Sequence, residues 1–285
     1  MGIDARPAAS PHDRPDRLHI YYVLGRADPR DAGFDSRFIG NWEEDDTSFL
    51  FFSADTTPEV EAFVQSRPEL TLVDHFDMAY DEWQPVDHFP IQAGGFSIHP
   101  AWSGATPDPA GRTLVLDPGV VFGSGCHATT SDCLEALDMA WSRQDLRPEK
   151  VLDLGTGTGI LSVAAAMLGA QAIVGVDINF LAAQTALRNT RLNRVQDRVL
   201  IVKGDATDFA GAPADLLMAN IHYDTMKHIL AGPGFLRCRS FILSGLLRTP
   251  ARMVLDRLEK MPVSITKQWN SDGIWYTLLG EVISG

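Results

Sequence analysis

Residues 151–161 combine an apolar strand, three closely spaced glycines and the start of a helix-forming segment: Val-Leu-Asp-Leu-Gly-Thr-Gly-Thr-Gly-Ile-Leu. Glycine lets the backbone turn tightly and approach a ligand that a side chain would keep away. The helix formers that follow, up to Gly169, direct a helix N-terminus at that ligand. The segment therefore predicts a strand, a ligand-binding turn and a helix, in that order.

Helix and strand patterns alternate from residue 130 to the end of the chain. We expect helices at 130–142, 159–168, 180–193, 224–230 and 249–260. We expect strands at 151–154, 172–176, 199–203, 215–219, 241–244, 263–269 and 274–283. These units predict a Rossmann-like α/β fold with a seven-stranded, mostly parallel sheet covered on both faces. The last two strands have no helix between them and should form an antiparallel hairpin at one edge.

The first third of the chain predicts a smaller α+β domain at residues 18–80. Its expected strands are 18–25, 48–53 and 70–78. A helix should begin with Thr57 as N-cap and Pro58 as first helical residue. Asp28-Pro29 and the acidic run 43–46 are typical of turns.

The remaining segments complete the predicted domain organisation. Residues 1–17, rich in Pro, Arg and Asp, are expected to form a disordered tail. Residues 81–95 are expected to be a linker. Residues 96–285 form the predicted ligand-binding domain, which two strands at 96–102 and 112–116 introduce.

Acidic side chains are concentrated in the first part of the chain. The net charge is −13; residues 1–100 hold 19 acidic and 7 basic side chains, whereas residues 101–285 hold 18 and 17. Such a chain lacks the basic footprint of a general nucleic-acid binder, so we expect no direct nucleic-acid binding. The excess negative charge serves either solubility or the electrostatic attraction of a basic partner.

Composition points to a cytoplasmic protein. No apolar run approaches the roughly 20 residues of a membrane helix, and residues 1–17 lack the apolar core of a secretory signal. The cysteines, Cys126, Cys133 and Cys238, have no Cys-x-x-Cys spacing. We therefore expect neither a disulfide framework nor a metal site.

The spacing of acidic residues narrows the ligand of the glycine turn. A dinucleotide site requires Gly-x-Gly-x-x-Gly, but Ile160 occupies the third glycine position. Asp177 ends the next strand, where a carboxylate can accept both ribose hydroxyls. Asp205 follows the strand after that, where it can accept the amino group of an adenine. Together these features resemble the class I S-adenosylmethionine-dependent methyltransferases, and the resemblance implies that Asp153, Gly155 and Gly157 also bind the cofactor.

A second motif precedes the glycine turn. Residues 116–130, Leu-Asp-Pro-Gly-Val-Val-Phe-Gly-Ser-Gly-Cys-His-Ala-Thr-Thr, resemble the signature loop of the ribosomal protein L11 methyltransferase family. The resemblance implies that Phe122 and Gly123 cover the methionine part of the cofactor and that Thr130 contacts it. Thr129 and Thr130 should cap the following helix. His127 is either a polar orienting group, a participant in proton transfer or purely structural.

A third motif, Asp215-Leu-Leu-Met-Ala-Asn-Ile-His, ends an apolar strand in Asn220. The family carries Asn-Ile-Leu here, which implies that Asn220 binds the target amine beside the cofactor's methyl group. His222 replaces the usual apolar residue, either as a surface substitution or as a change in substrate contacts.

The resemblance implies methyl transfer from S-adenosylmethionine to lysine side chains or the N-terminal amine of a basic protein, ribosomal protein L11. It covers about residues 90–285. It also implies that the acidic α+β domain at residues 18–80 recognises the substrate, although these residues hold no diagnostic motif. The alternatives are a lysine methyltransferase acting on another protein, such as an electron-transfer flavoprotein subunit, and a non-catalytic S-adenosylmethionine-binding module. A nicotinamide oxidoreductase is disfavoured by Ile160.

Overall fold

The computed structural model describes residues 14–29, 32–84, 88–143 and 147–283. The chain divides into two compact units: residues 1–87 with 179–181, and residues 88–178 with 182–285. Residues 1–13 of the expected tail and residues 85–87 of the expected linker lie outside the described residues. The predicted domain limits therefore remain a prediction. No described helix is long and apolar enough to cross a membrane.

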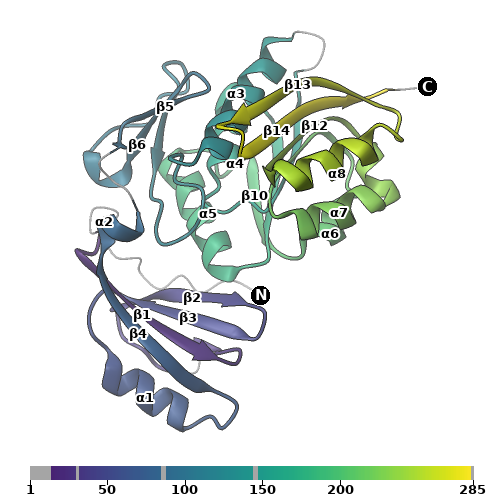
Figure 1. Ribbon diagram of the computed structural model, residues 1–285. Coiled ribbons are helices and arrows are strands. Elements are labelled where there is room, and N and C mark those ends of the chain that lie inside the picture. Colours follow the sequence, from purple (N-terminus) through teal and green to yellow (C-terminus); the bar gives the residue numbers. More distant parts are fainter. Residues whose placement is uncertain (1–13, 30–31, 85–87, 144–146, 284–285) are drawn as a thin grey trace. The chain divides into compact units, whose positions relative to one another are not determined.

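The smaller unit contains a four-stranded antiparallel sheet with one helix against it (Figure 1). Its strand order is β2-β3-β1-β4, and its elements are β1 (Arg17–Leu24), β2 (Phe38–Glu44), β3 (Thr47–Phe52), α1 (Thr57–Gln65), β4 (Thr71–Ala79) and α2 (Tyr80–Trp83). Val60 and Phe63 of α1 pack with Tyr21, Leu50 and Phe52 of the sheet in one core.

Two local predictions for this unit were wrong. Glu43 and Glu44 belong to β2, a strand that the sequence analysis did not expect, because its mixed polar residues do not alternate cleanly. Only Asp45 and Asp46 of the acidic run form the expected turn. The N-cap of α1 is Thr56, so Thr57 and Pro58 are the first two helical residues. Asp55 lies one residue earlier and accepts the Thr57 amide hydrogen.

The larger unit confirms the predicted seven-stranded sheet. Its order is β10-β9-β8-β11-β12-β14-β13, formed by β8 (Lys150–Leu154), β9 (Ala172–Asp177), β10 (Val199–Lys203), β11 (Ala214–Asn220), β12 (Cys238–Leu247), β13 (Val263–Ser271) and β14 (Trp275–Val282). The first five strands in this order are parallel. The last two form the expected antiparallel hairpin at one edge.

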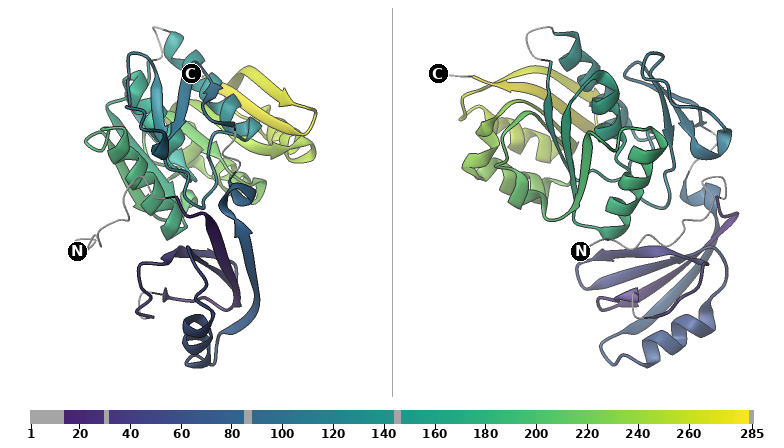
Figure 2. Two further views of the ribbon diagram at one scale, coloured as in Figure 1. Left: turned by 90° about the vertical axis from the view of Figure 1, so that its left-hand side faces the viewer. Right: turned by 180° about the vertical axis from the view of Figure 1, so that it is seen from behind.

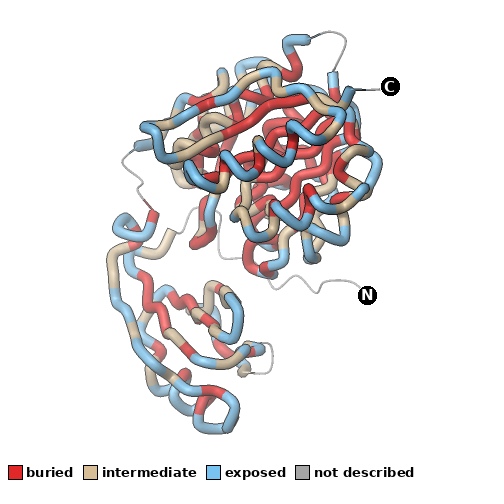
Figure 3. Tube along the Cα trace, turned by 45° about the vertical axis from the view of Figure 1, so that its right-hand side comes forward, coloured by how far each residue is buried: buried red, intermediate tan, exposed pale blue. Residues whose placement is uncertain are grey.

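Helices cover both faces of this sheet (Figure 2). On one face lie α3 (Ala128–Ser142) and α4 (Ile160–Leu168), and on the other α7 (Tyr223–Ala231) and α8 (Arg248–Leu258). The central strands are buried along most of their length, as Figure 3 shows. Alternate residues of β8 and β11 enter the two cores, because successive strand side chains point to opposite faces.

A three-stranded sheet extends the first of these cores. Its order is β5-β6-β7, formed by β5 (Ile91–Ala93), β6 (Phe96–Pro100) and β7 (Thr113–Leu116). Phe96, Ile98 and Leu114 are completely buried and pack in the same core as α3 and α4. The sequence analysis placed β5 in a linker, because three residues are too short to show a pattern.

Candidate active site

The strand order determines which predicted site residues are neighbours. Strands β10, β9, β8 and β11 lie side by side, and all four are parallel. At their carboxyl ends come Asp205, Asp177, the glycine turn and Asn220, in that order. Ligands of open α/β sheets bind at this edge. The chain therefore presents two carboxylates, a backbone turn and a side-chain amide in one row.

Other segments approach the glycine turn so closely that side chains would not fit. Gly155 and Gly157 have φ angles of 73° and 55°, which favour glycine. A Cβ on Gly157 would lie 2.7 Å from the Phe122 carbonyl oxygen. A Cβ on Gly155 would lie 2.2 Å from Cγ2 of Ile221. The turn is thus held between the loop before α3 and the end of β11.

Asp153 lies beneath the turn. Its side chain is buried, and Oδ2 accepts hydrogen bonds from the hydroxyls of Thr156 and Ser162, each over 2.6 Å. Burial raises the pKa of this carboxyl, although both hydroxyl bonds oppose that shift. These bonds tie β8, the turn and α4 together. The geometry supports a role for Asp153 in shaping the turn, and direct contact with a cofactor stays a prediction.

The two predicted nucleoside-binding carboxylates have different local partners. Oδ2 of Asp177 accepts the Gly157 amide hydrogen over 2.9 Å, which places this carboxylate against the turn. Asp205 is the N-cap of α6 (Ala206–Phe209), a short helix that was not predicted. Its Oδ1 accepts from the hydroxyl and the amide of Thr207, and these bonds lower the pKa of Asp205. Asp205 is therefore an ionised acceptor at neutral pH.

The loop before α3 is fastened to the glycine turn by Thr158. The Thr158 amide donates to the Phe122 carbonyl over 3.1 Å, and its hydroxyl donates to the Gly123 carbonyl over 2.6 Å. Phe122 itself is 51% exposed. Its ring contacts His127 edge to face at 5.3 Å, and His127 in turn contacts Trp275 at 4.9 Å. Two aromatic rings therefore flank His127 beside the turn.

His127, not the expected threonine pair, caps α3. Its Nδ1 accepts the Thr129 amide hydrogen over 3.3 Å and lies 2.8 Å from the Thr129 hydroxyl. Desolvation lowers the pKa of His127, which favours the neutral ring that this cap requires. The prediction failed because N-cap statistics favour threonine over histidine.

Thr129 and Thr130 instead lie in the first turn of α3, where both side chains are buried. The Thr129 hydroxyl accepts a hydrogen bond from Nδ2 of Asn220 over 3.3 Å. The Thr130 hydroxyl oxygen is buried and has no hydrogen-bond partner among the described residues. A buried hydroxyl of this kind is costly unless something binds it.

Three residues near the site were not predicted. A Cβ on Gly245 would lie 3.1 Å from Oδ1 of Asn220, so this glycine leaves room for the amide. Asn189 and Asn193 lie one turn apart on α5 (Phe180–Leu192) and just beyond its end. Their side chains hydrogen-bond the backbone of Asp117 and Val115, respectively, which fixes the start of the loop. The sequence did offer one signal for Asn189 and Asn193: two side-chain amides four residues apart lie on the same face of the helix predicted there.

Comparison with known proteins shows which family has this sequence. The model of the family described as ribosomal protein L11 methyltransferase (PrmA) matches residues 43–282. The chain belongs to this family. The match includes the glycine turn, the loop before α3 and Asn220, and it reaches back into the smaller unit.

Individual relatives of this family agree with that assignment. The ribosomal protein L11 methyltransferase of Syntrophotalea carbinolica is 40% identical over 198 residues, which are 66% of this chain and 61% of the relative. That of Desulfitobacterium hafniense is 42% identical over 143 residues, 50% of this chain and 44% of the relative. The chain thus spans less than two thirds of the length of these curated relatives. A crystal structure described as ribosomal protein L11 methylase from Lactobacillus delbrueckii subsp. bulgaricus superimposes with a TM-score of 0.57 at 26% identity, covering 67% of this chain and 96% of that one.

The residues present fit the cofactor that this family implies. S-adenosylmethionine carries an adenine, a ribose and an amino-acid tail, and the row of Asp205, Asp177 and glycine turn offers acceptors and backbone in the matching order. The Thr130 hydroxyl, which has no partner in the described part of the chain, is a further polar group for the tail. Exposed His222, at the N-cap of α7, makes no side-chain capping bond.

Proposed function

We propose that this chain transfers methyl groups from S-adenosylmethionine to protein amines, and that its substrate is ribosomal protein L11. The observation that carries the proposal is the position of Asn220 beside the glycine turn, one strand along from it. An amide acceptor in this position would lie next to the part of the site that holds the sulfonium end of the cofactor.

The bound cofactor supplies an activated methyl group, so the protein's task is mainly alignment. Thr129 fixes the Asn220 side chain through Nδ2, which directs Oδ1 as an acceptor for an amine hydrogen. An amine attacks only through its lone pair and must therefore be neutral. A free lysine has a pKa of about 10.4, so the site must favour loss of its proton. Exposed Phe122 and the ring of Trp275 form apolar surface next to His127 that reduces hydration there.

A basic substrate agrees with the distribution of charge. Residues 1–100 carry a net charge of −12 from 19 acidic and 7 basic side chains. Opposite charge accelerates association, and salt screens this effect. Raising the salt concentration should slow capture of ribosomal protein L11 and leave cofactor affinity nearly unchanged. Equal salt dependence of both would contradict electrostatic attraction. A cytoplasmic location, inferred from cysteine usage, stays a prediction.

Calorimetric titration tests the reaction class separately from the substrate. S-adenosylmethionine should bind, and the nicotinamide dinucleotide should not. Labelled cofactor in a lysate then tests the acceptor: ribosomal protein L11 should carry the label. A different labelled protein would retain the reaction and replace the substrate. Binding without transfer to any protein would favour a non-catalytic module.

A further inference from the structure

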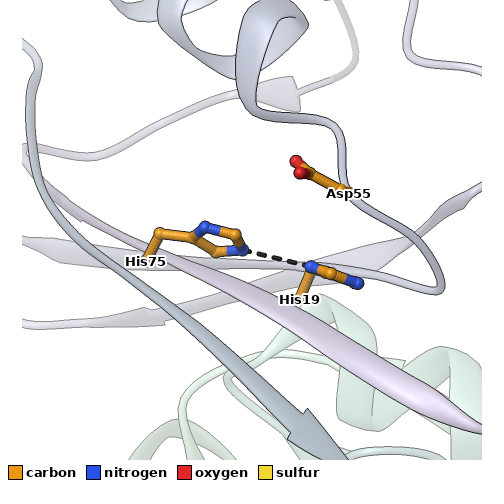
Figure 4. Close-up of side chains that lie close together, drawn as sticks. All are labelled: His19, Asp55 and His75. Carbon is orange, nitrogen blue, oxygen red and sulfur yellow. Dashed lines mark hydrogen bonds between the residues drawn. The ribbon is translucent and has the colours of Figure 1, made fainter.

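Two histidines and an aspartate converge in the smaller unit, apart from the candidate active site (Figure 4). His19 lies on β1, His75 on β4, and Asp55 between β3 and α1. One ligand atom of each residue lies within 4.8 Å of the other two. Nδ1 of His19 is 3.2 Å from Nε2 of His75.

Strand register explains why the histidines meet. Tyr21 pairs with His75, and His19 pairs with Asp77 in the antiparallel β1–β4 ladder. His19 and His75 are therefore diagonal neighbours on one face of the sheet, because side chains alternate with a period of two. Tyr21 shares this face and lies in the core with α1. Asp55 approaches the histidines from the segment just before α1.

We propose that His19, His75 and Asp55 bind a divalent transition-metal ion, and that zinc is the ion whose preferences they best meet. Zinc prefers imidazole nitrogen and carboxylate oxygen in tetrahedral geometry, with bonds of about 2.0–2.1 Å. Two nitrogens bound in this way lie about 3.3–3.4 Å apart, since the tetrahedral angle fixes their separation. The observed 3.2 Å matches this requirement. Asp55 is exposed, and one of its carboxylate oxygens lies within 4.8 Å of both imidazole nitrogens.

Neighbouring side chains hold the three ligands as a metal site requires. Metal-binding histidines usually donate their second ring N–H to a carboxylate, a backbone carbonyl or water. Oδ1 of Asp77 lies 3.7 Å from Nε2 of His19, and Arg17 holds this carboxylate over 2.7 Å. The ring of Tyr21 stacks on His75 at 4.2 Å and 5° between planes, which restricts the orientation of His75.

Asp55 is also preorganised as an anionic ligand. Its Oδ1 accepts hydrogen bonds from Tyr21 and from the amide and hydroxyl of Thr57. With Oδ1 held by these donors, the carboxylate is oriented and Oδ2 can bind a cation. The cluster combines one carboxylate with two imidazoles, a set that suits zinc.

A hydrogen bond between the two histidine rings is the competing explanation of the 3.2 Å distance. The two explanations differ in their response to added metal. Full-length protein treated with a chelator and dialysed should be titrated with zinc chloride by calorimetry. We expect one zinc ion per chain and a rise in Tm. Cobalt(II) should give the intense visible absorption of a tetrahedral site.

Variants then assign the ligands. His75→Ala and Asp55→Asn should each weaken zinc binding about tenfold or more. Asp55→Asn retains an acceptor for Tyr21 and Thr57, so it also tests whether the fold tolerates the change. His88→Ala, at an exposed position of the larger unit, is the matched control and should bind zinc normally. S-adenosylmethionine affinity, measured on the same samples, should not change. Absence of stoichiometric zinc binding, or binding unaffected by both ligand variants, would overturn the proposal.

Discussion

The amide nitrogen of Asn220 donates a hydrogen bond to the Thr129 hydroxyl over 3.3 Å. That hydroxyl lies 2.8 Å from Nδ1 of His127, which accepts its hydrogen when the neutral imidazole carries its proton on Nε2. A chain of hydrogen bonds thus runs from the end of β11 to the N-cap of α3. It joins the proposed amine-binding residue to the loop that adjoins the glycine turn.

Thr129→Val and Thr130→Val should affect different steps. Valine at 129 removes the bond to Asn220, so kcat should fall about fivefold, the equivalent of about 1 kcal/mol, with cofactor affinity nearly unchanged. Valine at 130 removes the buried hydroxyl that has no partner among the described residues. It should weaken S-adenosylmethionine binding about fivefold and slightly raise the Tm of the cofactor-free protein. Steady-state kinetics measures kcat and calorimetry measures cofactor affinity for both variants. A loss of affinity with Thr129→Val and a loss of kcat with Thr130→Val would refute the assigned roles.

The carboxylates should contribute unequally to cofactor affinity. Asp177→Ala removes the proposed acceptor of two ribose hydroxyls and should raise the Kd about 30-fold or more, since bonds to charged groups contribute about 1.5–3 kcal/mol. Asp205→Asn retains the N-cap of α6 but replaces one acceptor oxygen by a donor, so its effect should be smaller. Calorimetry at constant salt measures both. An Asp205→Asn defect larger than that of Asp177→Ala would contradict the larger contribution assigned to Asp177.

The His127 cap predicts a loss of stability in acid. The pKa of His127 in the folded protein is lowered from 6.5. At pH values between this lowered pKa and 6.5, the unfolded chain therefore binds more protons than the folded protein. Stability from the neutral ring is complete above pH 6.5 and is lost as the pH falls through the lowered pKa. His127→Asn retains a capping acceptor without a titrating ring. The Tm of the wild type should therefore fall more steeply below pH 6.5 than that of the variant; parallel curves would contradict this explanation.

Asn189→Ala and its neighbour Arg188→Ala should differ strongly in stability. Asn189 is completely buried and bonds both the backbone N–H and C=O of Asp117 and the carbonyl of Thr158. Alanine leaves these groups unpaired, which costs about 2–3 kcal/mol. Arg188 pairs with Asp117 from a side chain that is 43% exposed, and such pairs contribute about 0–1 kcal/mol. Urea unfolding of the two variants measures the difference, and equal destabilisation would show that the Asn189 amide does not fix this loop.

The residues at the ligand-binding edge of the parallel sheet could be predicted because each of them comes directly at the end of a predicted strand. Once Val151–Leu154 is a strand, Asp177 and Asn220 must occupy the same carboxyl edge, whatever the order of the strands. The identity of the α3 cap was not predictable in this way. His127 caps the helix because the loop positions its ring between Phe122 and Trp275, and Trp275 is 148 residues away in the sequence.

Contacts set by register escaped the sequence analysis for the same reason. His19 and His75 belong to strands that were both predicted, yet only the pairing of β1 with β4 brings them together. The cysteine spacing that argued against a metal site carries no information about this pair. Gly245 likewise matters through its approach to Asn220, which depends on the pairing of β11 with β12.

The central claim is that Asn220 aligns a protein amine for methyl transfer, and mass spectrometry of purified ribosomal protein L11 tests it most directly. Incubation with S-adenosylmethionine and the wild-type chain should add the mass of one or more methyl groups. Asn220→Ala should bind the cofactor normally but methylate about tenfold more slowly or worse. No mass gain with the wild type would eliminate this substrate. An equal gain with Asn220→Ala would contradict the assigned role of Asn220.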